Sequence, residues 1–424
     1  MTPVDYLFSL EMLGIKLGLD NIRRLLADLD HPDRAFHSIV IAGTNGKGSV
    51  AAMLERALRA AGWRTGLYTS PHLIRLNERF AIDGQAVDDE AMRAGAEGIR
   101  HAARKINPPP TFFEATTALA CELFRTSGVD VAVMEVGLGG RLDATNALEP
   151  VATAITAVDF DHQAHLGSTI EQIAAEKAGI IKTGVPVVLG ANPAEVRDVV
   201  RRIAADRRAP LVDAAASVDV ESTFDEGRLT LTMRTHGARY GPVTLGLRGR
   251  HQRENATTLV ALAEAIDRHT AIGAPASAIE TGLRDVEWPA RLQMLTWHGT
   301  PVLVDAAHNP SGARALAAYV SEVHGRAPFV FAAMQDKDIE GVLAPLVPVM
   351  ASLTLTRPST PRAASLESLA ATAARVAPVV PVTAMASPAA AVEQAARDAA
   401  VRAGAPVVVA GSLYLAGDVL AALS

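Results

Sequence analysis

Three glycines, a lysine and a serine lie close together in the stretch Ser38–Ser49, SIVIAGTNGKGS. The stretch begins as a short apolar run, typical of a buried strand, and then breaks into the glycines. At such a strand-to-helix turn, backbone N–H groups converge on an anion, and the dipole of the following helix adds partial positive charge. Lys47 is suited to contact the terminal phosphates of a nucleotide, and the Ser49 hydroxyl is suited to reach a magnesium ion. We therefore predict a phosphate-binding loop.

The alternative for this stretch is a glycine-rich turn that only caps a helix. The strict phosphate-loop pattern has a glycine five residues before Gly46, where this sequence has Ile41. The flanking strand and the pair Lys47 and Ser49 nevertheless favour phosphate binding in a shorter variant of the loop. By itself, the loop predicts only a nucleotide-binding protein.

Polar residues end or follow three further apolar runs. Glu135 closes one run, and Ser70 and His162 follow two others. Ligands gather at the carboxyl ends of strands in open α/β sheets, so we expect these side chains on the same rim as Lys47. A carboxylate there is suited to hold the magnesium ion of a magnesium–nucleotide complex. The alternatives are a structural role for Glu135 and a hydrogen-bonded core position for His162, and the sequence favours neither role for His72.

Alternating helices and strands must position these residues. After the loop, the pattern predicts a helix at 50–61 and strands at 65–69, 129–136 and 152–158. This alternation is the signature of a mainly parallel sheet that is covered on both faces. Between about 213 and 247, short alternating segments predict a small antiparallel β appendage.

A second alternation of strands and helices runs from Arg291 to Ala410. We place the main boundary near Trp288, which predicts a larger domain at 1–288 and a smaller Rossmann-like α/β domain at 289–424. The predicted fold class is therefore α/β with two domains, which suits a chain of 424 residues.

The composition excludes several classes of protein. Hydrophobic residues make up 49% of the chain and charged residues 20%, as in a globular protein. A net charge of −6 argues against a nucleic-acid or anionic-membrane partner. The single cysteine excludes an intramolecular disulfide and a cysteine-rich zinc site. The first residues carry Asp5 and Glu11 instead of signal-peptide features, and no uncharged apolar stretch reaches the ~20 residues of a membrane span. We expect a cytoplasmic protein.

Ten motifs occur in order from Gly43 to Gly417: GTNGKGS, TSPHL, MEVGLGGRLDATN, DH-x-x-x-LG, AAEKAGIIK, HQRENA, PARLQ, AHNP, AAMQDKD and GSLYLAG. Together they resemble the folylpolyglutamate synthase and dihydrofolate synthase branch of the Mur ligase superfamily. The resemblance implies a P-loop Mur-ligase-type ATPase domain with folate-binding loops at 1–288 and a glutamate-ligase domain at 289–424.

The resemblance implies ATP-dependent amide synthesis. In this family, a substrate carboxylate attacks the γ-phosphate of ATP to give an acyl phosphate and ADP, and the amine of L-glutamate then displaces phosphate. Magnesium ions and a lysine neutralise the charge that grows during phosphoryl transfer. The implied substrates are ATP, L-glutamate and dihydropteroate or a reduced folate, the implied cofactors are ATP and two Mg²⁺ ions, and we expect a monomer.

Four residues are implied to be catalytic. Lys47 matches the lysine at the β- and γ-phosphates, and Glu135 and His162 match ligands of a first and a second magnesium ion. Lys177 matches a lysine that many members carry as a metal-binding carbamate, although taken alone it is typical of a solvated helix lysine. The sequence leaves carbamylation open. The implied metal ligands are Ser49, Ser70, Glu135, His162 and Lys177.

Further positions match ligand contacts of the family. Asp143 and Ala144 match positions that meet the pterin, and Ser412 resembles a residue near the incoming glutamate. The sequence departs from the family at Ala306, where Asp-Gly-Ala-His-Asn-Pro has glycine, which affects the local geometry more than the function. Phe112–Phe113 are favoured as core residues over a substrate platform. The implied ATP contacts are Gly43, Thr44, Asn45, Gly46, Lys47, Gly48, Ser49, Asn255, Arg291, Asp305 and His308.

Two other functions remain alternatives. One is a Mur-type ligase that joins another amino acid to another carboxylate, such as a peptidoglycan precursor; the motifs RLDATN and TSPHL favour folate over it. The other is a non-catalytic nucleotide-binding module, which predicts the loss of metal ligands. The presence of Glu135, His162 and Lys177 argues against that module.

Overall fold

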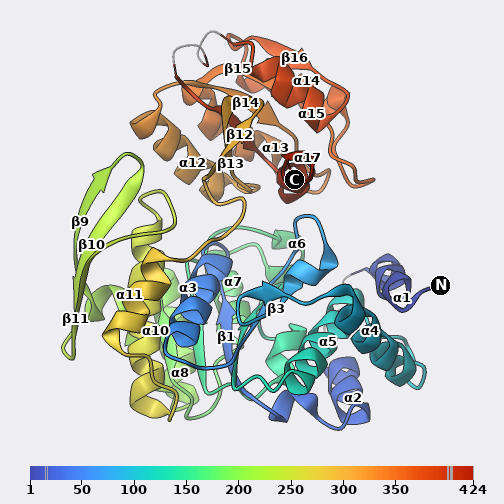
Figure 1. The fold of residues 1–424 in the computed structure, drawn as a ribbon, viewed down its shortest axis with the longest axis vertical. Helices are drawn as coiled ribbons and strands as arrows, with labels where there is room; N and C mark the ends of the chain where they lie inside the picture. The colour runs from blue at the N-terminus through green and yellow to red at the C-terminus, as the bar shows by residue number, and fades with distance from the viewer. Residues whose placement is uncertain (15, 17, 399–400, 402–403, 424) are drawn as a thin grey trace. The chain divides into compact units, whose positions relative to one another are not determined.

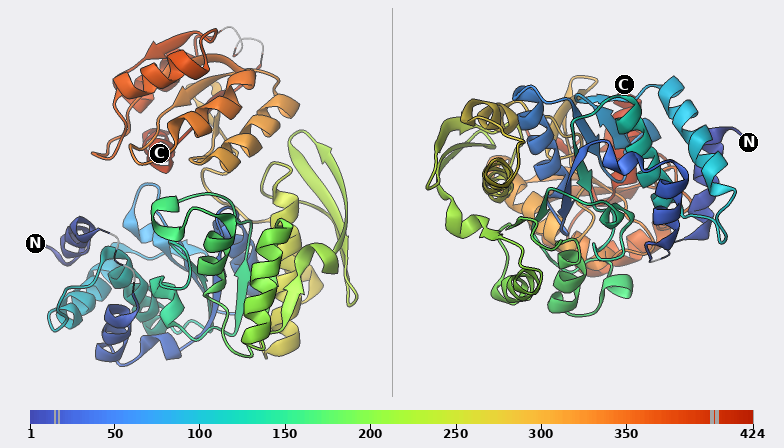
Figure 2. Two further views of the ribbon diagram at one scale, coloured as in Figure 1. Left: turned by 180° about the vertical axis from the view of Figure 1, so that it is seen from behind. Right: turned by 90° about the horizontal axis from the view of Figure 1, so that it is seen from below.

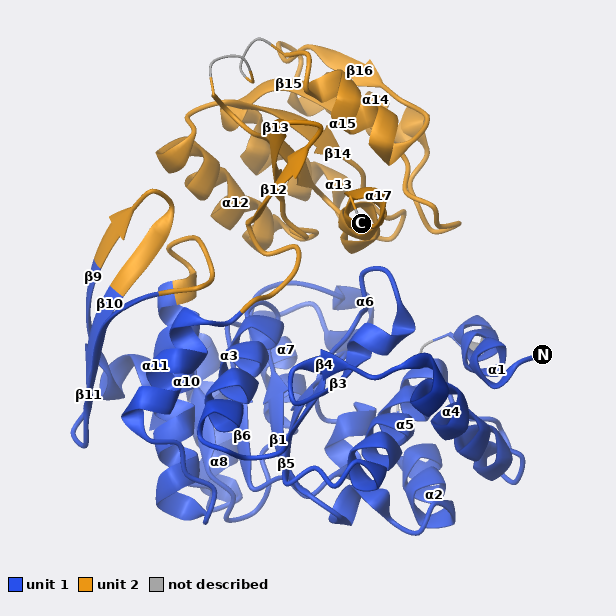
Figure 3. Ribbon diagram, viewed as in Figure 1, with its two compact units in different colours: residues 1–222, 231–244, 253–286 blue, residues 223–230, 245–252, 287–424 orange. Residues whose placement is uncertain are grey.

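The computed structural model describes residues 1–14, 16, 18–398, 401 and 404–423, which form two compact units. Figure 3 colours the two units separately. The last change of unit lies between residues 286 and 287, close to the predicted boundary, but two short segments before that point group with the second unit. Unit 1 comprises residues 1–222, 231–244 and 253–286, and unit 2 comprises residues 223–230, 245–252 and 287–424.

The main sheet of unit 1 has eight strands in the order β4-β3-β2-β5-β1-β6-β7-β8. Along the sheet, the strands β2, β5, β1, β6, β7 and β8 pair in parallel in this order. At one edge, β3 and β4 are antiparallel. Helices lie on both sides of these strands (Figures 1 and 2), and the central strands are accordingly buried along nearly their whole length. The predicted mainly parallel α/β fold is confirmed. The strands are β1 (His37–Ala42), β2 (Thr65–Tyr68), β3 (Phe80–Ile82), β4 (Gln85–Ala86), β5 (Val131–Glu135), β6 (Ala152–Ile155), β7 (Val187–Leu189) and β8 (Leu211–Asp213).

The helices of unit 1 begin at side-chain caps where the sequence provides them. The Thr111 hydroxyl accepts a hydrogen bond from the Glu114 N–H and the Glu114 carboxylate accepts one from the Thr111 N–H, and Thr169 and Gln172 repeat this arrangement. The helices are α1 (Pro3–Ser9), η1 (Leu10–Leu13), α2 (Asp20–Asp28), η2 (Pro32–Arg34), α3 (Lys47–Ala60), η3 (Leu76–Arg79), α4 (Asp89–Ala103), α5 (Phe112–Thr126), η4 (Ala144–Ala147), α6 (Gln163–Leu166), α7 (Ile170–Ala178), α8 (Ala194–Asp206), α9 (Ala214–Ser217), α10 (Gln252–His269) and α11 (Ala276–Arg284).

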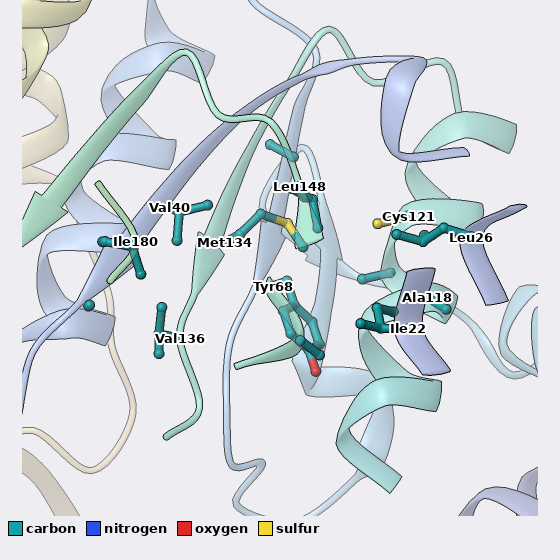
Figure 4. Close-up of a cluster of buried hydrophobic side chains, with 14 of the residues drawn as sticks. Ile22, Leu26, Val40, Tyr68, Ala118, Cys121, Met134, Val136, Leu148 and Ile180 are labelled. Carbon is teal, nitrogen blue, oxygen red and sulfur yellow. The ribbon is translucent and has the colours of Figure 1, made fainter. Parts of the chain in front are cut away.

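The core of unit 1 joins the central strands to the helices α2 and α5. Figure 4 shows Val40, Tyr68 and Met134, from three neighbouring strands, together with Ala118 and Cys121 of α5. All five side chains are at most 1% exposed. Such close packing resists small displacements, so it holds the strand ends at fixed spacing.

A three-stranded sheet in the order β11-β10-β9 follows the main sheet in the chain. Its strands are β9 (Asp219–Asp225), β10 (Arg228–Arg234) and β11 (Arg239–Thr244). Glu226 and Gly227 connect the first two with φ values of 46° and 78°, which is the pattern of a tight antiparallel hairpin. The predicted antiparallel appendage is confirmed, and Figure 3 shows that the hairpin tip carries the colour of unit 2.

Unit 2 is built on a six-stranded sheet in the order β12-β13-β17-β14-β15-β16. The strands pair in parallel except for β12, an antiparallel edge strand that the sequence pattern does not predict. Its elements are β12 (Gln293–Trp297), β13 (Thr300–Val304), α12 (Pro310–Val323), β14 (Ala327–Phe331), α13 (Ile339–Leu343), η5 (Ala344–Val349), β15 (Met350–Leu355), α14 (Leu366–Val376), β16 (Val382–Ala384), α15 (Pro388–Ala395), β17 (Val407–Ala410) and α17 (Leu413–Leu423). Within the described part of the chain, no helix has the length and apolar content that a membrane span needs.

Candidate active site

The strand order of unit 1 brings the predicted residues to one rim. In the order β2-β5-β1-β6, each strand ends beside the next, and Glu135 at the end of β5 pairs with Ile41 of β1. Ser70 follows β2, the loop before Lys47 follows β1, and His162 lies beyond the end of β6. Parallel strands end at the same edge of a sheet, so four stretches far apart in sequence share one edge.

The loop after β1 needs glycine at two positions. Gly43 has φ of 152° and Gly46 has φ of 89°, values that other residues rarely adopt. A Cβ atom on Gly43 would lie 1.9 Å from Oγ1 of Thr156, and one on Gly46 would lie 2.3 Å from Oδ1 of Asn255. Asn255, a predicted ATP contact, therefore lies directly against the loop.

Hydrogen bonds to the segment after β6 hold the loop in place. The N–H of Thr44 donates to the carbonyl oxygen of Ala157 at 2.7 Å, and the Thr44 hydroxyl donates to that of Asp159 at 2.9 Å. The hydroxyl of Thr156 donates to the carbonyl oxygen of Asn45 at 2.7 Å. Thr156 is not among the residues predicted from the sequence, although a hydroxyl residue directly after a central strand is a signal that could have found it.

Two lysines meet at the carbonyl oxygen of Gly43. Nζ of Lys47 donates to it at 3.1 Å and to the carbonyl oxygen of Thr44 at 3.2 Å, and Nζ of Lys177 donates to the Gly43 oxygen at 2.9 Å. Lys177 is only 4% exposed, so it is not a solvated helix lysine. Burial, reinforced by the charge of Lys47, lowers the pKa of Lys177 to about 7. An amine with that pKa is partly neutral near pH 7.

The donors at the rim suit a magnesium ion that enters with a nucleotide. Glu135 is 6% exposed and its Oε2 accepts a hydrogen bond from the N–H of Ser70 at 3.2 Å, while Ser49 is buried in the first turn of α3. Among the described residues there is no group of three or more His, Cys, Asp or Glu side chains that could hold a metal ion. Magnesium commonly uses one or two carboxylates together with phosphate oxygens, and this donor set fits that pattern.

His162 stands at the start of α6 with a left-handed backbone, φ 51°. Its N–H donates to Oδ1 of Asp161 at 2.8 Å, and its Nε2 lies 3.8 Å from the same oxygen. The imidazole is 37% exposed, so the core position considered from the sequence is wrong. The ring is accessible to a ligand.

Asp143 organises the glycine-rich loop after β5 from inside. Its carboxylate accepts hydrogen bonds from the N–H groups of Gly137, Leu138 and Thr145 at 3.1, 2.9 and 3.0 Å, and from the Thr145 hydroxyl at 2.6 Å. Burial raises its pKa despite these bonds. Asp143 and Ala144 are 5% and 3% exposed, so a substrate role for either remains a prediction.

His72, which the sequence left open, is paired with a buried arginine. Its Nδ1 accepts a hydrogen bond from Nε of Arg79 at 2.9 Å, and burial together with the Arg79 charge lowers its pKa to about 4. The Arg79 guanidinium lies 5.1 Å from the centre of the Phe112 ring, which stacks on Phe8. Phe112 and Phe113 are half-buried and pack against the hydrophobic core of unit 1.

Unit 2 carries the remaining predicted residues. The Asp305 carboxylate, just after β13, accepts hydrogen bonds from the N–H groups of Leu292 and Ala307, both at 2.9 Å. Nδ1 of His308 lies 2.8 Å from the carbonyl oxygen of Ala306 and must donate to it. Ser412 is 1% exposed, and its hydroxyl accepts the N–H of Tyr414 at 3.1 Å.

Comparison with known proteins decides the family. A model of the Mur ligase middle domain matches residues 41–263, and one of the Mur ligase glutamate ligase domain matches residues 290–413. A dihydrofolate synthase/folylpolyglutamate synthase of Bacillus subtilis is 34% identical over 360 residues, covering 83% of each chain. The chain belongs to the folylpolyglutamate synthase and dihydrofolate synthase branch of the Mur ligases.

Solved structures of this Mur ligase branch match the whole chain. A folylpolyglutamate synthase of Mycobacterium tuberculosis, complexed with ADP and AMPPCP, is 33% identical with a TM-score of 0.90, covering 100% of this chain and 99% of the other. A bifunctional folylpolyglutamate synthase/dihydrofolate synthase of Yersinia pestis, complexed with AMPPNP and a manganese ion, is 30% identical with a TM-score of 0.85, covering 100% and 98%. The predicted class, an ATP-dependent carbon–nitrogen ligase, is confirmed.

This Mur ligase departs from its family pattern at Ala306 without strain. Ala306 is fully buried and is not among the residues with positive φ, so its methyl group occupies a backbone position open to any residue. Its N–H donates to the carbonyl oxygen of Ala290 at 2.9 Å.

Proposed function

We propose that this enzyme joins L-glutamate to dihydropteroate, to a reduced folate, or to both, through an acyl phosphate formed with ATP. The meeting of Lys47 and Lys177 at the Gly43 carbonyl, beside Glu135 on the rim, is the observation that carries the proposal. It gathers cationic groups where an anionic nucleotide and an anionic acceptor must be brought together. Two observations support it: the related proteins are named dihydrofolate synthase and folylpolyglutamate synthase, and solved structures of such proteins are complexed with nucleotides.

The loop residues have the first role in this proposal. The N–H groups of Gly46–Ser49 and the Lys47 ammonium hold the β- and γ-phosphates of ATP at the N-terminus of α3, and Gly43, Thr44 and Asn45 shape the loop beside them. Glu135, Ser49 and Ser70 hold a first magnesium ion, which would neutralise charge on the transferring phosphoryl group. In unit 2 we assign nucleotide contacts to Arg291, Asp305 and His308, in addition to Asn255 of unit 1.

For Lys177 we propose carbamylation. The ammonium first loses one proton to solvent, and the neutral amine then attacks carbon dioxide. An N–C bond forms as one C=O π bond opens, and a second proton leaves to solvent, which gives an anionic carbamate. The pKa of about 7 supports this step, because the neutral amine is abundant near pH 7. With His162, the carbamate would hold a second magnesium ion. As an ammonium, Lys177 repels a metal ion, so the second ion depends on the modification.

The two substrates have separate proposed contacts. Asp143 and Ala144 are assigned to the pterin of the acceptor, and Ser412 to the incoming glutamate. We further propose that the enzyme acts as a monomer in the cytoplasm.

The assay that tests the function supplies Mg·ATP, L-glutamate and either dihydropteroate or tetrahydrofolate. We expect ADP, phosphate and glutamylated product in equal amounts with at least one acceptor. Absence of glutamate-dependent ADP formation with both acceptors contradicts the proposal. A panel of other carboxylates and amino acids, including peptidoglycan precursors, separates it from another Mur-type ligase.

A further inference from the structure

Arg291 stands between two residues with a strained backbone. Ala290 has φ of 56° and Leu292 has φ of 47°, both in the left-handed region. Residues other than glycine adopt this region at a cost, because Cβ approaches the following carbonyl oxygen. One such residue lies on each side of Arg291, and their strained backbone conformations persist only if the surrounding structure holds them.

Side chains on either side hold this turn. Oε1 of Gln293 accepts the N–H of Ala290 at 2.9 Å, and Oδ2 of Asp305 accepts the N–H of Leu292 at 2.9 Å. The carbonyl oxygen of Ala290 accepts the N–H of Ala306 at 2.9 Å. Ala290 and Leu292 are 0% and 1% exposed, so each of these backbone groups is satisfied away from water.

The held turn fixes the direction in which Arg291 leaves the backbone. Arg291 is half-buried, and its charge acts on two neighbours, opposing the rise in the pKa of Asp305 and contributing to the fall in that of His251. A guanidinium binds a phosphate through a rigid fork of N–H groups, so its orientation decides how well it binds. A guanidinium that is already oriented before the ligand arrives loses less conformational entropy on binding.

We propose that Gln293 is a positioning residue that acts through Arg291 on ATP binding. Gln293 begins β12, where it pairs with Val304, and its side-chain oxygen turns back to the strained Ala290. The inference rests on the proposed function, in which Arg291 contacts ATP. It assigns to Gln293 a role in ATP binding that is exercised through the Ala290 backbone and Arg291.

The test compares Gln293→Leu, which removes the acceptor, with Gln293→Glu, which keeps one. We expect Gln293→Leu to raise KM for ATP roughly three- to tenfold, the scale of one lost hydrogen bond. KM for glutamate should stay unchanged, and Gln293→Glu should restore KM for ATP to within about twofold of the native value. Thr296→Ala, at an exposed position of the same strand, is the control and should leave both constants unchanged. Because KM does not depend on the fraction of enzyme that is folded, partial misfolding does not imitate this result.

A double variant tests whether the effect passes through Arg291. If it does, Arg291→Ala combined with Gln293→Leu has the same KM for ATP as Arg291→Ala alone. The inference is overturned if the two substitutions raise KM for ATP independently, so that their fold-changes multiply in the double variant. It is also overturned if Gln293→Leu raises KM for ATP and KM for glutamate equally. An unchanged KM for ATP in Arg291→Ala overturns it together with the nucleotide role of Arg291. Product formation by the native enzyme is read separately and decides the ligase activity itself.

Discussion

The ammonium groups of Lys47 and Lys177 both donate to the carbonyl oxygen of Gly43, at 3.1 and 2.9 Å. Lys47 belongs to the phosphate loop. Lys177 belongs to α7 and lies 134 residues further along the chain than Gly43. Two like charges at one carbonyl are unfavourable unless anions join them or one amine loses its charge. The arrangement therefore suits a site that binds anionic phosphates and in which Lys177 becomes neutral or is modified.

Lys177→Ala should abolish turnover while ATP still binds. We expect kcat to fall on the order of 10³-fold, because the second metal site loses a ligand, with Kd for ATP changed less than about fivefold. Short carboxylic acids should restore part of the rate if the carbamate is real. Lys182→Ala is the matched control and should keep its turnover, since Lys182 is a part-buried lysine that donates to the Asn146 carbonyl oxygen instead of the loop. A parallel loss of ATP affinity and rate would indicate a structural role for Lys177.

The buried amine of Lys177 should also make stability depend on pH. Its pKa falls from 10.5 to about 7 on folding, so between these values the unfolded chain binds more protons and stability rises with pH. In buffer free of carbon dioxide, the Tm of Lys177→Met relative to the native enzyme should be highest near pH 7 and should decline toward pH 10. A difference in Tm that is constant over this range would show that folding does not lower the pKa of the Lys177 amine.

Gly46→Ala should impair nucleotide binding through a collision as well as backbone strain. The new Cβ would lie 2.3 Å from Oδ1 of Asn255, at φ of 89°. We expect a loss of about 1–3 kcal/mol in the free energy of unfolding and at least a ~10-fold rise in Kd for ATP. Gly62→Ala is the control, because Gly62 has φ of 95° but nothing within 4 Å of its added Cβ. Calorimetry should show that the control loses stability yet keeps its affinity for ATP.

Asp143→Asn should weaken acceptor binding more than ATP binding. The amide replaces one carboxylate oxygen with a donor, which faces the N–H groups of Gly137 and Leu138 or of Thr145. Such an unsatisfied buried contact costs about 1–3 kcal/mol of unfolding free energy and loosens the loop. Steady-state kinetics should give a higher KM for dihydropteroate or folate. Asp130→Asn is the control. Asp130 lies just before β5 and accepts a hydrogen bond from one backbone N–H, that of Arg64, so this substitution should leave the KM unchanged.

Local features of this protein followed from the sequence because they depend on neighbouring residues. Glycine spacing and one lysine predicted the phosphate loop, and the alternation of apolar runs predicted the strands that end near Glu135 and just before Ser70. The edge strand β12 escaped prediction, because an edge strand lacks the continuous apolar pattern of a central one.

The sequence by itself determined the residue types of the site, the α/β class and, through its motifs, the ligase family. Only the tertiary structure decided that Lys177 is buried against Gly43, that Thr156 supports the loop and that Asp143 faces inward. These facts depend on the strand order β2-β5-β1-β6, which brings distant segments together. The pKa of Lys177 follows from the same cause, since desolvation depends on what surrounds an amine in space and not on its neighbours in the chain.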